Sequence, residues 1–331
     1  LQAAGQQLRA QAPQLASLVT SGGIEAAQMA AALGPKEALV GFFGSGKNLV
    51  GYTVSGAEIR LYPLDAQGLE DDVAEFVQSI KKRRRQTREL AEVLYKRLLR
   101  PMQASITGRD LLIVPHGSLH YVPFAALHDG ERFLVQGRAL RYLPSAMLLG
   151  LLPQPGSKAA GAPVQRLLIL GNPDLGKAEL DLPASQEEAQ ALQGLFAANS
   201  ELFIRKAATE SLIKERAFDF SHIHVASHGE FSADAPLDSR LRLAADAKND
   251  GVLSVSEIYG LRLNAQVVML SACETGLGRV SSGDDVVGLT RGFLYAGAQN
   301  VVGSLWEVDD DATSALSQAM YDGLKKGLPV A

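Results

Sequence analysis

The apolar positions in the first half of the chain switch between strand-like and helix-like spacing. Short β-rich runs are separated by turn residues such as Gly44-Ser45-Gly46-Lys47-Asn48, which is typical of an antiparallel meander. Further on, apolar residues recur at steps of three and four, which predicts helix until Pro101 ends it. The predicted elements are a helix at 8–19, strands at 38–43, 49–54 and 58–62, one long helix or two at 70–99, and a strand at 111–114.

The second half alternates strand-like and helix-like segments after a Pro/Gly/Ala-rich linker at 153–163. This alternation predicts an α/β fold with a mainly parallel sheet sandwiched by helices. We therefore expect two lobes, residues 1–150 and residues 151–331. The predicted elements are strands at 166–170, 202–205, 222–226, 266–270 and 300–304, and helices at 185–198, 210–218, 286–295 and 312–324.

Composition excludes several classes of protein. A formal net charge of −4 without an aromatic-rich basic stripe argues against nucleic acid as the main ligand. The sequence lacks both a run of about 18 apolar residues and a secretory signal, so we expect no membrane span and a cytoplasmic location. A single cysteine among 331 residues excludes an internal disulfide framework and a cysteine-based zinc cage.

Two predicted strands end in residues that can do chemistry together. Strand 222–226 runs into Ser227-His228-Gly229, and strand 266–270 runs into Ser271-Ala272-Cys273. Ligands of open α/β sheets collect beyond the carboxyl ends of the strands. An imidazole can take the proton of a thiol and later protonate a leaving amine. The backbone N–H groups of Gly229 and Cys273 could then stabilise an oxyanion.

A structural alternative exists for each of these two side chains. A lone cysteine on a strand is usually a small buried hydrophobe, and a lone histidine is usually structural. Their matched positions at two strand ends favour the catalytic hypothesis.

Several motifs together resemble CHAT domains, a family of caspase-like, separase-related cysteine peptidases that often follow tetratricopeptide repeats. The resemblance covers nearly the whole chain and is carried by 112–127, Leu143-Pro-Ser145, Ser227-His-Gly229, Leu270-Ser-Ala-Cys-Glu-Thr-Gly276, 288–297 and 304–310. It implies a caspase-like catalytic lobe at 151–331 after a pseudo-caspase-like lobe at 1–150. It also implies an endopeptidase without a cofactor, in which His228 and Cys273 form the catalytic dyad, with a protein substrate and a repeat module or regulatory partner.

The segment 305–310 resembles a separase stretch, Leu-Trp-Asp-Val-Thr-Asp. This resemblance implies a preference for a basic P1 residue, with Asp310 receiving its charge, Trp306 forming an aromatic wall and Ser271 lining the same pocket. Alternatively, Asp310 serves only to cap the helix predicted at 312–324.

Other motifs are set aside on their context. The segment 41–48 matches a phosphate loop, but Asn48 replaces the magnesium-binding Ser or Thr and a strand follows, so a hairpin is expected. His116 and His120 do not share a helical face as zinc ligands would. The basic run 81–85 follows four acidic residues and is interpreted as a solvated helical face. The rival functions are a non-catalytic signalling or interaction domain and a nucleotide-binding switch.

Overall fold

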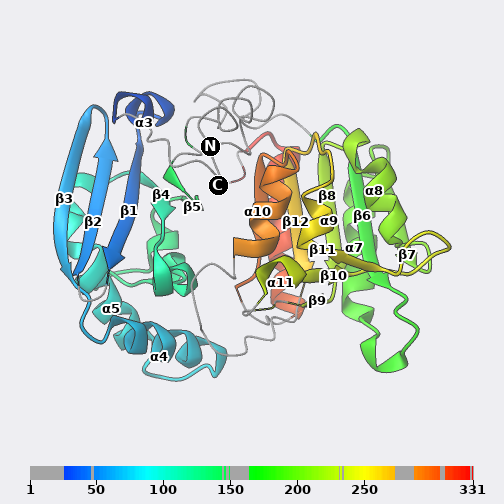
Figure 1. The fold of residues 1–331 in the computed structure, drawn as a ribbon, viewed down its shortest axis with the longest axis horizontal. Helices are drawn as coiled ribbons and strands as arrows, with labels where there is room; N and C mark the ends of the chain where they lie inside the picture. Colours follow the sequence, from blue (N-terminus) through cyan, green and yellow to red (C-terminus); the bar gives the residue numbers. More distant parts are fainter. Residues whose placement is uncertain are drawn as a thin grey trace, which may run out of the picture. The chain divides into compact units, whose positions relative to one another are not determined.

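The computed structural model divides the chain into two compact units, residues 1–157 and 158–330 (Figure 1). It describes residues 26–45, 48–143, 145–146, 149, 164–230, 232, 235–272, 287–305, 310–328 and 330. The helix predicted at 8–19 and the linker at 153–163 lie outside these residues. The pseudo-caspase-like character of the first lobe stays a prediction.

The first unit is built on a five-stranded mixed sheet in the order β3-β2-β1-β4-β5. The predicted meander is confirmed, because β1, β2 and β3 pair antiparallel, whereas β4 and β5 extend the sheet in parallel. Its strands and α-helices are α3 (Ala26–Ala32), β1 (Glu37–Ser45), β2 (Asn48–Ser55), β3 (Glu58–Asp65), α4 (Leu69–Lys81), α5 (Thr87–Leu98), α6 (Gln103–Ile106), β4 (Asp110–Val114) and β5 (Leu140–Tyr142).

Two expectations about motifs in this unit have clear outcomes. Strands β1 and β2 pair with Ser45 opposite Asn48, which is the hairpin expected in place of a phosphate loop. The basic run is not a helical face, because α4 ends at Lys81 and α5 begins at Thr87. Arg83 has a φ of 49°, a left-handed conformation that interrupts a helix, so the run forms an exposed turn.

The second unit contains a five-stranded sheet in the order β13-β12-β8-β6-β7, and every strand pair in it is parallel. The α/β class predicted from the alternating pattern is therefore confirmed. Its strands and α-helices are β6 (Leu167–Pro173), α7 (Pro183–Leu195), β7 (Ser200–Arg205), α8 (Glu210–Arg216), β8 (His222–Ser227), β9 (Gly229–Glu230), β10 (Arg240–Arg242), β11 (Val252–Ser254), α9 (Val255–Ile258), β12 (Val267–Ala272), α10 (Val287–Tyr295), β13 (Asn300–Gly303) and α11 (Asp310–Lys325).

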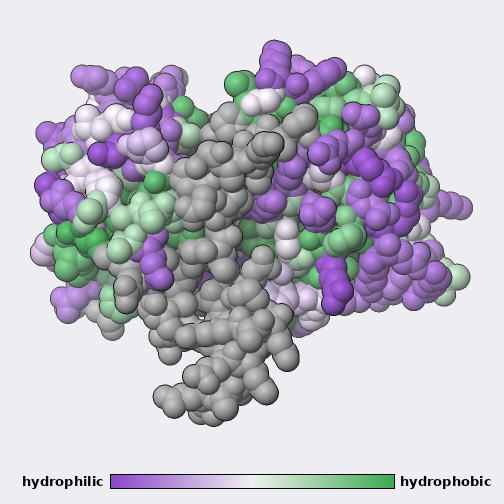
Figure 2. All heavy atoms as spheres, turned by 90° about the horizontal axis from the view of Figure 1, so that it is seen from above, coloured by the Kyte–Doolittle hydropathy of each residue, from purple (hydrophilic) through white to green (hydrophobic). Residues whose placement is uncertain are grey.

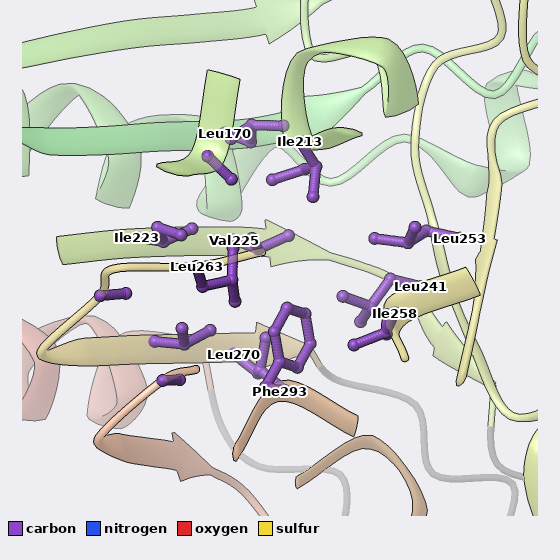
Figure 3. Close-up of a cluster of buried hydrophobic side chains, with 14 of the residues drawn as sticks. Leu170, Ile213, Ile223, Val225, Leu241, Leu253, Ile258, Leu263, Leu270 and Phe293 are labelled. Atoms are coloured by element: carbon purple, nitrogen blue, oxygen red, sulfur yellow. The ribbon is translucent and has the colours of Figure 1, made fainter. Parts of the chain in front are cut away.

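Helices cover both faces of this parallel sheet. Val268 and Leu270 of β12 belong to a core with α8, α9 and α10, part of which is shown in Figure 3. Val267 and Met269, which alternate with them along the strand, pack with α7 and α11 instead. Because successive side chains of a strand point to opposite faces, a nearly continuous apolar strand fills two cores at once.

A small antiparallel sheet in the order β11-β10-β9 follows β8 and was not expected from the sequence. Its strands have only two or three residues each, too few to give an alternating pattern. Strand β9 begins at Gly229, directly after His228, so this sheet fixes how the chain leaves β8.

The described surface mixes hydrophilic and hydrophobic residues, as the face shown in Figure 2 illustrates. Leu61 on the edge strand β3 and Phe43 on β1 are among its exposed apolar residues. In the part of the chain that the structure describes, no helix is both long enough and apolar enough to cross a bilayer.

The core around α10 generates a stability prediction. Phe293 is fully buried beside Leu270 (Figure 3), so Phe293→Ala should lower the free energy of unfolding by about 3–5 kcal/mol. Phe218→Ala is the matched control, because the Phe218 side chain is exposed, and its effect should stay within about 0.5 kcal/mol. Urea denaturation followed by circular dichroism measures both. Equal losses in the two variants would contradict this core.

Candidate active site

The strands that precede His228 and Cys273 are neighbours in the second sheet. Strands β8 and β12 pair in parallel, and their last paired residues are Ser227 and Ala272. His228 and Cys273 each follow one of these residues in the sequence. Neighbouring strands lie about 4.8 Å apart, so the register leads both segments to the same edge of the sheet. Cys273 itself lies outside the described residues.

The imidazole of His228 is oriented by a backbone carbonyl. His228 is 9% exposed, and its Nε2 lies 3.0 Å from the carbonyl oxygen of Leu180 in the 3₁₀ turn Ala178–Leu180. A carbonyl can only accept, so Nε2 is the donor and carries the proton. In the neutral imidazole, Nδ1 is then the basic nitrogen that can take a proton from a thiol.

Asn172 holds the segment that presents the Leu180 carbonyl. The Asn172 side chain is buried, and its Oδ1 accepts from the Leu182 N–H at 2.9 Å while its Nδ2 donates to Asp181 at 2.9 Å. Asp181 also pairs with Arg205. The Asn172 hydrogen bond, aided by the Arg205 charge, lowers the pKa of Asp181. The two residues that follow Leu180 are therefore both held in place.

The backbone N–H of Gly229, the expected oxyanion donor, is not part of the hydrogen-bond ladder between β9 and β10. The Arg242 N–H donates to the His228 carbonyl at 2.9 Å, and Gly229 stands opposite Leu241. In an antiparallel ladder, the pair next to such a hydrogen bond is a non-hydrogen-bonded pair. The Gly229 N–H therefore points away from β10.

Ser271 is buried, and its hydroxyl donates to Glu188 on α7 at 2.8 Å. Its expected place in a P1 pocket stays a prediction. Asp310 is the first residue of α11. Trp306 lies outside the described residues, so the expected pocket of these three residues stays a prediction.

Two further histidines of β8 are buried on the α7 and α11 side of the sheet. Burial lowers the pKa of His222 to about 4. Burial also lowers the pKa of His224, although the nearby Glu188 charge opposes this shift. The hydroxyl of Tyr321 lies 3.5 Å from His224 Nδ1. Burial together with the Glu188 charge raises the pKa of Tyr321. Both imidazoles are neutral at pH 7.

Among protein-family models, that of the CHAT domain matches residues 88–331 of this chain. The chain belongs to the CHAT domain family. This family is caspase-like and related to peptidases, in agreement with the all-parallel sheet between two helical layers.

The CHAT domain is also similar to two curated proteins that carry repeats. Tetratricopeptide repeat protein 28 of Mus musculus is 26% identical over 290 residues, which cover 71% of this chain. The protein of the same name from Homo sapiens is 25% identical over 289 residues, also 71% of the chain. The matched region spans 12% of each relative's own length.

Three residues around the site of this CHAT domain were not expected from its sequence. Leu180 acts through its carbonyl, so its side chain gives no signal. Asn172 and Glu188 are ordinary polar residues in the sequence, and only their burial marks them. Among the described residues, no cluster of His, Cys, Asp and Glu side chains could hold a metal ion.

The buried His222 generates a pH prediction. Its unfolded pKa is near 6.5 and its folded pKa is about 4, so the unfolded state takes up a proton first as pH falls. The free energy of unfolding should therefore fall by at most about 3 kcal/mol between pH 6.5 and pH 4. His222→Phe should flatten this part of the stability curve.

The matched control for His222→Phe is His116→Phe, because His116 is exposed. Urea denaturation at a series of pH values measures all three proteins. A curve for His222→Phe parallel to that of the parent protein would show that His222 is not buried in its neutral form.

Proposed function

We propose that this CHAT domain is a cysteine endopeptidase whose dyad is His228 and Cys273. In the proposed reaction, His228 Nδ1 takes the Cys273 thiol proton, and the thiolate attacks the scissile carbonyl carbon. The N–H groups of Gly229 and Cys273 stabilise the oxyanion.

The amine then leaves with the proton from His228, and a thioester remains on Cys273. A water molecule gives a proton to His228 and attacks the thioester carbonyl. The C–S bond breaks, the acid is released, and the thiolate recovers the proton. No cofactor is needed for these steps.

The observation that carries this proposal is the hydrogen bond from His228 Nε2 to the Leu180 carbonyl. A structural histidine needs only satisfied hydrogen bonds, whereas a general base needs its second nitrogen held toward the nucleophile. The register of β8 with β12 supports the same assignment, because it leads the chain of Cys273 to that edge.

The proposed partners are a protein substrate and a tetratricopeptide-repeat module. The two relatives are named for such repeats, and this domain corresponds to 12% of their length. We propose that such a repeat module presents substrates to this domain or controls it. A non-catalytic relay for such a module is the rival function.

Peptidase activity is tested with a peptide library. Cys273→Ala and His228→Ala should each reduce kcat/KM by at least about 100-fold, because the first removes the nucleophile and the second removes the general base. His116→Ala is the matched control and should retain activity. Circular dichroism checks that the variants fold. Cleavage near the parent rate in either dyad variant would reject the dyad, and no cleavage by the parent would favour the relay.

We also propose that the enzyme prefers Arg or Lys at P1 and that Asp310 receives its charge. A charge-assisted hydrogen bond contributes about 1.5–3 kcal/mol, so Asp310→Asn should lower kcat/KM for basic P1 peptides about ten- to a hundredfold. Asp311→Asn is the matched control, since it removes the same charge from the same helical turn. Equal effects of the two variants would assign Asp310 to the helix terminus and not to the pocket.

A further inference from the structure

Four buried polar side chains meet between the parallel sheet and its α7 and α11 layer. Glu188 lies on α7, His224 on β8, Ser271 on β12 and Tyr321 on α11. All are buried, and the Glu188 side chain is 5% exposed. The surrounding layer is mainly apolar, with Ile169 and Met269 on the sheet. We call these four residues the polar cluster.

The hydrogen bonds of the polar cluster have a definite direction. Ser271 donates its hydroxyl proton to Glu188 Oε2 at 2.8 Å, because a carboxylate accepts. The Tyr321 hydroxyl faces His224 Nδ1 at 3.5 Å, and His224 Nε2 lies 3.5 Å from Glu188 Oε1. A neutral His224 with its proton on Nε2 fits both neighbours. Ser271 makes the shorter and better contact to Glu188.

A buried carboxylate is an expensive way to fill this layer. Removing it from water is energetically costly, and well-packed apolar residues often stabilise a core equally well or better. Among the described residues, Glu188 Oε1 has no hydrogen-bond partner, so the cost is not fully recovered. Stability alone therefore does not account for Glu188.

The location of Ser271 indicates what Glu188 does. Ser271 of β12 stands opposite Ala226 of β8, near the carboxyl ends of both strands. Ser271 lies two residues before Cys273, and Ala226 lies two residues before His228. A hydrogen bond at this point ties the end of β12 to α7. His224 lies on β8, so the same carboxylate faces both strands that lead to the dyad.

We propose that Glu188 is a positioning residue for the nucleophile, acting through the hydroxyl of Ser271 to fix the carboxyl end of β12 relative to β8. The inference rests on the proposed function, in which Cys273 is the nucleophile paired with His228. A thiol held at the correct distance from an imidazole has a larger thiolate fraction, whereas a displaced thiol returns toward its ordinary pKa near 8.5.

The experiment measures the reactivity of Cys273 directly. It is the only cysteine in the sequence, so intact-mass spectrometry after iodoacetamide treatment follows a single thiol. The rate of Cys273 alkylation is measured as a function of pH, which gives a pH profile with a midpoint. In Glu188→Gln, the alkylation rate at pH 7 should fall about tenfold and the midpoint of this profile should rise by about one pH unit. Glu187→Gln, the same change at the exposed neighbouring residue of α7, should match the parent protein.

Ser271→Ala tests the route of the effect and remains informative if Glu188→Gln does not fold. It should shift the profile in the same direction, and the double variant should add nothing to the larger single shift. Iodoacetamide has no P1 side chain, so a pocket role of Ser271 does not change its rate.

His228→Ala separates the two proposals. If it shifts the profile while Glu188→Gln and Ser271→Ala do not, the positioning role is wrong and the dyad stands. If it leaves the profile unchanged, the dyad is wrong. Additive shifts from Glu188→Gln and Ser271→Ala would also overturn the inference, because they would show that the two residues act independently.

Discussion

The parallel register of β8 with β12 is the constraint on which the candidate site depends. It is fixed by packing, because a slip of one residue would turn Val268 and Leu270 out of one core and Val267 and Met269 out of the other. Two apolar layers thus hold the strands that end just before His228 and Cys273. The side chains that the proposed chemistry needs come directly after those strand ends.

Orientation within the site comes from polar groups that are buried around it. Asn172 anchors the segment that offers the Leu180 carbonyl to His228, and this selects the tautomer with a basic Nδ1. Glu188 on α7 accepts the hydroxyl hydrogen bond of Ser271 on β12. In the proposed enzyme, one set of contacts orients the base and the other orients the strand of the nucleophile.

The fold was predictable from the sequence where periodicity is long. The alternation after residue 160 predicted the parallel sheet, and the motifs around His228 and Cys273 predicted the family. The sheet of β9, β10 and β11 was missed because its strands are too short to show a period. The interpretation of the basic run 81–85 as a helical face was wrong, since charged residues fit an exposed turn as well as a helical face. Leu180 contacts His228 through its backbone carbonyl, and Glu188 is distinguished by its burial. Both features depend on the folded arrangement, so the sequence alone does not reveal them.

The most direct measurement of the central claim is the trapping of an acyl-enzyme. A peptide ester with a basic P1 residue, mixed with the protein and quenched in acid, should add the mass of its acyl group to Cys273. The His228→Ala variant should accumulate this species far more slowly. Turnover of the ester without any acylated Cys273, or equal acylation rates in the two proteins, would contradict a His228–Cys273 peptidase.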